Sequence, residues 1–171
     1  MFKRILSVNE VMEEMSIFFF CSRQTGKSTY LKNAFPNAMY IDLLDTSVRR
    51  IYKNQPSVLY DQLTGSNTST VIIDEITEVP DLLNEVHRLI FKTDIRFVIC
   101  ASSARKLRRK GANTLGGRAF PCYLYPLVSA EIPELDIDRA INVGMIPTHY
   151  LSKRPQILLS AYIDVYLQQE I

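Results

Sequence analysis

The chain has 171 residues, of which 47% are hydrophobic, and its 20 basic and 18 acidic residues leave a formal net charge of +2. This length is typical of one domain with a single core, and the nearly balanced charge gives no electrostatic reason to expect a nucleic acid or a membrane as partner. The apolar stretch at residues 17–20 is far shorter than the roughly 20 residues that span a bilayer. We therefore expect a cytoplasmic protein without a membrane anchor.

Helical and strand patterns alternate through most of the chain. Apolar residues at helical spacing predict a helix over residues 5–15, and the aromatic run at 17–20 predicts a buried strand. Further strands are expected at residues 38–43, 70–73, 96–101 and 121–124, and helices at residues 27–35, 48–54 and 81–90. This alternation predicts an α/β fold with a parallel sheet and helices on both faces.

Beyond residue 130 the pattern changes to helices without strands. Residues 136–143 and 155–171 have helical spacing, which divides the chain into a core at 1–130 and a helical segment at 131–171. The last helix carries an apolar stripe that includes Ile157, Ala161 and Val165. We expect this stripe to bind a protein partner or a second copy of the chain.

A candidate phosphate-binding loop follows the first strand. Strand, loop and helix start follow one another here, so that backbone N–H groups can point at phosphate oxygens. Lys27 would reach the β- and γ-phosphates of a nucleotide, and the Ser28 hydroxyl would ligate Mg²⁺. The candidate nucleotide-binding residues are Arg23, Gln24, Thr25, Gly26, Lys27, Ser28 and Thr29.

This loop departs from the pattern G-x-x-x-x-G-K-[ST] at its first glycine, which is Cys21 here. If the position needs a left-handed backbone, a side chain costs roughly 1–2 kcal/mol, enough to weaken nucleotide binding about tenfold. On that basis Cys21→Gly should tighten binding.

A second motif ends in two carboxylates. Residues 70–73 form an apolar, β-branched run, and Asp74 and Glu75 follow it directly. At the carboxyl edge of a parallel sheet, Asp74 would hold Mg²⁺ through its water shell and Glu75 would orient and deprotonate an attacking water. The alternative is a buried strand that ends in solvated acids. The two motifs in this order favour a nucleoside triphosphate site.

Several blocks resemble the predicted prokaryotic ATPases of the AAA+ superfamily that usually carry a C-terminal domain of unknown function. The blocks are residues 23–29, 40–45, 71–76 with 79–80, 101–109, 117–119, 125–127 and 163–171. The resemblance implies a P-loop three-layer sandwich with strand order 5-1-4-3-2, ATP as the nucleotide and a helical lid that is incomplete in this chain. It also implies that Ser102 senses the γ-phosphate and that Arg118 has a phosphate-sensing or finger-like role.

Three functions remain open at this point. The first is a Mg²⁺-dependent ATPase, and the second is a truncated or degenerate nucleotide-binding module with little turnover. A small-molecule kinase is disfavoured because no substrate-binding insertion is evident. The basic run at residues 105–110 is interpreted as a solvated surface helix in preference to a nucleic-acid site, because no aromatic residues interleave with its charges.

Overall fold

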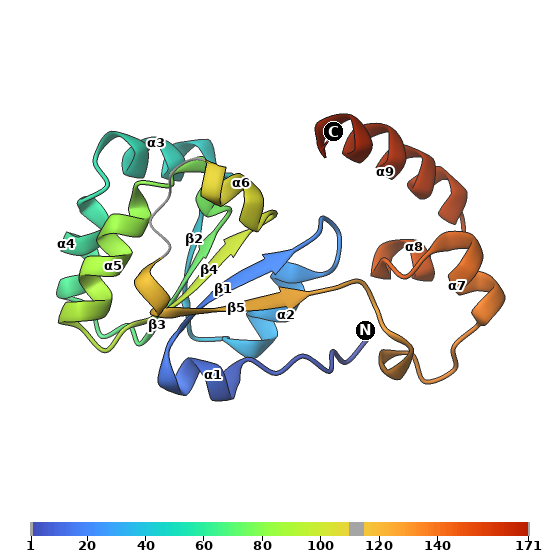
Figure 1. Ribbon diagram of the computed structural model, residues 1–171, viewed down its shortest axis with the longest axis horizontal. Helices are drawn as coiled ribbons and strands as arrows, with labels where there is room; N and C mark the ends of the chain where they lie inside the picture. The colour runs from blue at the N-terminus through green and yellow to red at the C-terminus, as the bar shows by residue number, and fades with distance from the viewer. Residues whose placement is uncertain (1, 110–114, 171) are drawn as a thin grey trace.

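The computed structural model describes residues 2–109 and 115–170, and its centre is a five-stranded sheet (Figure 1). The strands are β1 (Ser16–Cys21), β2 (Met39–Asp42), β3 (Thr70–Asp74), β4 (Arg96–Ala101) and β5 (Ala119–Leu124). All paired strands are parallel, in the order β2-β3-β4-β1-β5. Counted from the opposite edge this is 5-1-4-3-2, so the predicted fold class and strand order are confirmed.

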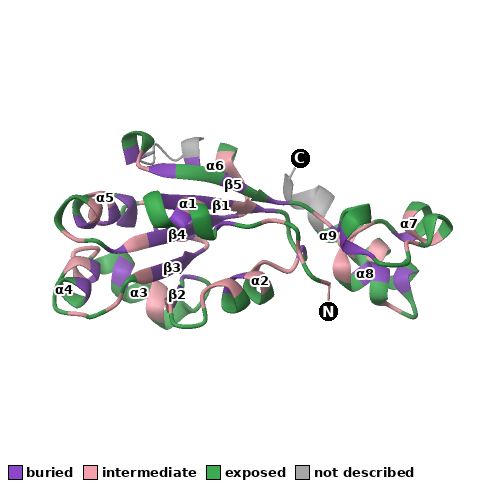
Figure 2. Ribbon diagram, turned by 90° about the horizontal axis from the view of Figure 1, so that it is seen from below, coloured by how far each residue is buried: buried purple, intermediate pink, exposed green. Residues whose placement is uncertain are grey.

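Helices cover both faces of the sheet. They are α1 (Asn9–Glu14), α2 (Lys27–Ala34), α3 (Thr46–Asn54), α4 (Val58–Thr64), α5 (Leu82–Lys92) and α6 (Ala104–Arg109), with short 3-10 turns η1 (Ile76–Glu78) and η2 (Leu115–Gly117). Side chains alternate along β1, so that Phe18 packs in the core under α4 and α5 while Ile17 and Phe19 pack in the core under α1 and α2. Buried residues accordingly concentrate in the strands and on the inner sides of the helices (Figure 2).

The predicted first helix is too long at its start. α1 begins at Asn9, and the residues before it run as an extended segment. The Ile5 N–H donates to Glu131 Oε1 at 2.9 Å, and the Arg4 side chain reaches the same carboxylate. These long-range bonds satisfy backbone groups that a helix would otherwise need to pair. Val8 is buried but Ile5 is 65% exposed, so the apolar spacing over residues 5–8 does not mark one buried helix face.

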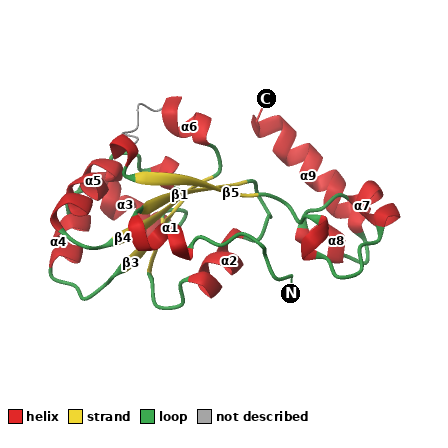
Figure 3. Cartoon of the chain, turned by 60° about the horizontal axis from the view of Figure 1, so that its bottom comes forward, coloured by secondary structure: helices red, strands yellow, loops and turns green. Residues whose placement is uncertain are grey.

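A helical segment follows β5. It contains the 3-10 turn η3 (Ser129–Glu131) and the helices α7 (Ile137–Val143), α8 (Pro147–Leu151) and α9 (Pro155–Glu170). Its small core consists of Leu127, Ile132, Val143 and Tyr150. Figures 1 and 3 show these helices beside the sheet, past the end of β5, where they lie on neither face of it. The short helix α8 was missed by the sequence prediction.

Two surface features bear on the sequence predictions. Ile157 and Val165 on α9 are 63% and 52% exposed, so the expected apolar stripe is at the surface. Residues 104–109 form α6, while Lys110, the last residue of the basic run, lies outside the described residues. Over residues 2–109 and 115–170, no helix combines the length and the apolar character needed to cross a bilayer.

Candidate nucleotide-binding site

The phosphate loop is a tight turn between β1 and α2. Gly26 caps the start of α2 with φ +91°, a left-handed conformation that a residue with a Cβ adopts at a cost. The Thr25 hydroxyl donates to the Ser22 carbonyl at 2.9 Å and ties the loop to itself. Gly26 therefore meets the conformational need of this turn, and the first residues of α2 open onto a cavity.

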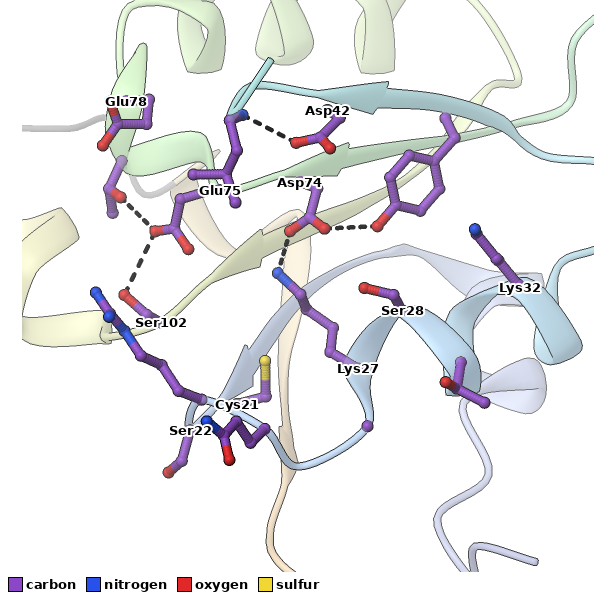
Figure 4. A pocket seen from close by; sticks show the side chains of 17 residues that line it. Cys21, Ser22, Lys27, Ser28, Lys32, Asp42, Asp74, Glu75, Glu78 and Ser102 are labelled. Carbon is purple, nitrogen blue, oxygen red and sulfur yellow. Dashed lines mark hydrogen bonds and ion pairs between the residues drawn. The ribbon is translucent and has the colours of Figure 1, made fainter. Parts of the chain in front are cut away.

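Lys27 meets Asp74 across that cavity. The Lys27 Nζ donates to Asp74 Oδ1, and the Tyr40 hydroxyl donates to Asp74 Oδ2 at 2.5 Å (Figure 4). Burial alone would lower the pKa of Lys27, but the Asp74 carboxylate outweighs this and the pKa is raised overall. Lys27 is therefore a permanent cation whose ammonium faces the end of β3.

Glu75 follows β3 in a left-handed conformation, with φ 56° and ψ 57°. Its Oε1 accepts hydrogen bonds from Thr77 Oγ1 at 2.5 Å and from Ser102 Oγ at 3.4 Å. A left-handed backbone at a non-glycine residue costs of order 1–3 kcal/mol and persists only where the surroundings hold it. The structure therefore orients this carboxylate, and Ser102 lies beside it (Figure 4).

The cavity between these groups has a volume of about 1210 Å³. It is lined by the predicted residues Arg23, Gln24, Gly26, Lys27, Ser28, Thr29, Asp74, Glu75 and Ser102, and also by Cys21, Ser22, Lys32, Tyr40, Asp42, Leu44, Thr77 and Glu78. The structure thus brings four separate sequence segments to one edge of the sheet. Tyr40 was missed as a site residue because its signal in the sequence is only that of a strand residue.

Two predicted residues do not line this cavity. Thr25 is fully buried beneath the loop. Arg118 directly precedes β5, at the end of the sheet opposite the phosphate loop, and its guanidinium lies 4.2 Å from the centroid of the Phe91 ring. A role for Arg118 in phosphate sensing would need a neighbouring molecule, and it stays a prediction.

Cys21 does not have the strained backbone that the sequence analysis assumed. Among the described non-glycine residues, positive φ values occur at Gln24, Glu75 and Leu115, whereas Cys21 is the last residue of β1 and pairs with Leu124. Its side chain is 8% exposed, and burial, which outweighs the opposing effect of Lys27, raises the pKa of the thiol to about 11. The premise for expecting tenfold weaker binding is therefore wrong.

Arg4 also binds the phosphate loop, through the backbone carbonyl of Thr25. The Arg4 Nη1 donates to the Thr25 carbonyl at 2.8 Å, and its Nε pairs with Glu131 Oε1 at 3.0 Å. The two charged side chains are only 11% and 3% exposed. The sequence analysis missed this ion pair because its partners lie 127 positions apart.

A second cavity of about 670 Å³ lies between the N-terminal segment, α2 and the helical segment. Its apolar lining includes Phe2, Leu6, Val8, Tyr30, Leu127 and Leu151. Gln24, Gly26 and Thr29 line both cavities. The phosphate loop therefore separates a polar cavity from a more apolar one.

Comparison with known families gives one match. The model of a family described as an AAA domain matches residues 14–133, more than two thirds of the chain. The chain belongs to the AAA domain family. It is an AAA-type P-loop NTPase domain.

Two similar solved structures have low sequence identity to this chain. A structure described as showing DNA unwinding at forked dsDNA by two coordinating Pif1 helicases is 15% identical with a TM-score of 0.46, covering 92% of this chain and 52% of that one. The Aeropyrum pernix ORC1 protein in complex with DNA is 13% identical with a TM-score of 0.48, covering 92% and 56%. This chain thus spans about half the length of these two. No curated protein sequence matches it.

The residues of the polar cavity suit a magnesium ion. The described residues contain no group of three or more His, Cys, Asp or Glu side chains that could hold a metal. Ser28 and Asp74 supply a hydroxyl and a carboxylate at the cavity, and Mg²⁺ prefers such oxygen ligands together with waters and substrate phosphates. The donor set therefore fits Mg²⁺ carried by a nucleotide.

Proposed function

We propose that the chain binds ATP with Mg²⁺ and hydrolyses it to ADP and phosphate. The observation that carries the proposal is the meeting of Lys27, Asp74 and Glu75 around one cavity, from the start of α2 and the end of β3. Phosphoryl transfer to water needs a cation, a metal-binding carboxylate and an oriented second carboxylate.

The triphosphate lies against the phosphate loop in this proposal. Backbone N–H groups at the start of α2 and the helix dipole favour the phosphate charge. Lys27 carries three N–H donors, so it can keep its bond to Asp74 while it binds phosphate oxygens. Ser28 and Asp74 would hold Mg²⁺, which would neutralise charge on the phosphates.

Glu75 is the residue that activates water. Ser102 and Thr77 fix its Oε1, which leaves Oε2 to accept a hydrogen bond from water at the cavity. A positioned carboxylate that accepts a proton typically contributes about 10²- to 10⁴-fold in rate. In this proposal Ser102 meets the γ-phosphate by donating its one hydroxyl hydrogen to a phosphate oxygen in place of Glu75.

The nucleobase occupies the second cavity in this proposal. This cavity adjoins the polar one at Gln24, Gly26 and Thr29, and its Phe2, Leu6 and Tyr30 side chains offer apolar surface to a planar ring. An apolar cavity with polar groups at its mouth is typical of a small-molecule site. A base on one side of the loop and phosphates on the other would bury the whole nucleotide.

Steady-state phosphate release from Mg²⁺-ATP tests the hydrolysis step. Glu75→Gln keeps the shape of the side chain and removes its basicity, so turnover should fall by about 10²-fold or more. Glu85→Gln on α5 is the matched control, because Glu85 does not line the polar cavity and pairs with Arg88 instead. Equal phosphate release from wild type and Glu75→Gln would contradict the role of Glu75.

A nucleotide-binding module with little turnover is the second candidate. It is favoured by the finding that both oxygens of Asp74 already accept side-chain hydrogen bonds, from Lys27 and Tyr40. The same assay separates the two functions, because such a module binds ATP but releases no phosphate that Glu75→Gln could reduce.

A further inference from the structure

The phosphate loop is hydrogen-bonded to the helical segment through Gln24. Its Oε1 accepts from Thr148 Oγ1 at 3.3 Å and from His149 Nε2 at 3.2 Å, and both donors lie on α8. Gln24 also lines both cavities. The contact therefore joins α8 to the loop at the point where the two cavities meet.

His149 is an unusual donor because it is buried. The residue is 1% exposed, and its ring packs edge-on against Tyr162 of α9 with centroids 5.5 Å apart. Its Nδ1 has no hydrogen-bond partner within the described parts of the chain. A buried ring nitrogen without a partner is costly, so packing alone gives little reason to keep a histidine here. The bond to Gln24 is the polar contact that the ring makes.

The loop is thereby held from two sides. Arg4 binds the carbonyl of Thr25, and α8 binds the side chain of the preceding residue, Gln24. The backbone of Gln24 is left-handed, with φ 62°, two residues before the glycine that caps α2. Gln24 sits within the turn that presents the N–H groups of the loop, so its side-chain contacts link this turn to α8.

We propose that Gln24 and His149 form a positioning pair that holds the phosphate loop in its nucleotide-binding conformation. The inference rests on the proposed function, and it adds that nucleotide affinity depends on the placement of α8. Binding linkage is reciprocal, so a nucleotide on the loop also stabilises α8 against it. His149 acts through Gln24 and touches no phosphate.

Titration of the full chain with a fluorescent ATP analogue and Mg²⁺ tests the pair. His149→Phe keeps a ring against Tyr162 but has no donor, and Gln24→Ala removes the acceptor. His149→Phe should weaken binding about threefold to tenfold, as expected for one lost hydrogen bond, and Gln24→Ala, which also loses the Thr148 bond, at least as much. The double variant should be no weaker than Gln24→Ala, because His149 acts through Gln24.

A variant that restores the hydrogen-bond donor distinguishes a positioning role of His149 from a packing role. His149→Gln restores an N–H donor in place of Nε2, so it should keep wild-type affinity. His87→Phe is the matched control, since it removes the other histidine, which lies on α5 away from the loop. If His149→Phe does not fold, Gln24→Ala and Thr148→Val test the proposal instead, because Gln24 and Thr148 are exposed and their replacement should leave the fold intact. Each of these variants should lower the affinity for the nucleotide.

The outcomes distinguish this inference from the function on which it rests. Saturable binding by wild type that Lys27→Ala abolishes supports the nucleotide site. If His149→Phe and Gln24→Ala then bind like wild type, or if their effects multiply, the positioning pair is overturned while the site stands. If wild type does not bind, both fail together.

Discussion

Lys27 and Asp74 form an ion pair across the polar cavity, although they belong to two motifs that lie 47 positions apart. Their side chains are 17% and 6% exposed, so the two charges lie largely out of water. Tyr40 completes the pair through the second oxygen of Asp74. The residue that would bind phosphate thereby also fixes the residue that would hold the metal.

Removing one partner of this pair should destabilise the fold. Lys27→Met leaves the Asp74 carboxylate buried without its cation, and such a loss typically costs about 3–5 kcal/mol. Lys27→Met combined with Asp74→Asn should cost much less than the sum of the two single changes. Urea denaturation of the four proteins measures this coupling, and additive effects would show that the pair contributes no net stability.

Cys21→Gly should not tighten nucleotide binding. Cys21 lies in regular strand geometry and its side chain packs in the core, so glycine relieves no strain and removes buried contacts. We expect the free energy of unfolding to fall by about 1 kcal/mol and the affinity for Mg²⁺-ATP to stay the same or decrease. A tenfold gain in affinity by calorimetric titration would show that the thiol crowds the phosphates.

The buried ion pair of Arg4 and Glu131 should couple the N-terminal segment to the phosphate loop. Arg4→Met alone leaves the Glu131 carboxylate, which is 3% exposed, without its cation. This change should lower the free energy of unfolding by about 3 kcal/mol. Combining Arg4→Met with Glu131→Gln, which is neutral but keeps an oxygen acceptor for the Ile5 N–H, should recover much of this loss. Thermal denaturation checks the stability, and an unaltered melting temperature in Arg4→Met would argue against the pair.

Stability should fall at high pH through Cys21. The pKa of its thiol is raised from 9.0 to about 11, mainly by burial. Between these values the unfolded chain has lost the proton while the native chain keeps it, so the free energy of unfolding decreases as the pH rises. The loss is at most about 3 kcal/mol. Denaturation curves for wild type and Cys21→Ala should diverge in this window, and parallel curves would contradict the assignment.

The two motifs that meet at the polar cavity could be recognised in the sequence because each is a local pattern, whereas the strand order followed from the family resemblance. Gly26-Lys27-Ser28 after a buried strand and Asp74-Glu75 at the end of another are contiguous patterns, and parallel strands bring their carboxyl ends to one edge. The backbone of Cys21 could not be inferred in this way. Strand pairing with β5 extends β1 through this residue, and the loop pattern holds no information on that pairing.

The contacts behind the loop could not be predicted at all. Arg4 pairs with Glu131 over 127 positions, and Gln24 bonds to His149 over 125. No periodicity or spacing connects such residues in the sequence, and each has an ordinary surface role when considered alone. Only the docking of the helical segment beside the end of β5 brings them together.

Titration of the chain with Mg²⁺-ATP tests the central claim most directly. The proteins compared are wild type, Lys27→Ala, Ser28→Ala and the control Lys53→Ala. All are measured at a temperature where circular dichroism shows each to be folded. Lys53 on α3 lies outside both cavities, so its variant matches the charge change without touching the site. We predict saturable binding by wild type and Lys53→Ala, and weaker binding by at least about tenfold in Lys27→Ala and Ser28→Ala. Equal affinity in all four proteins, or no binding by folded wild type, would contradict the assignment of this cavity as an ATP site.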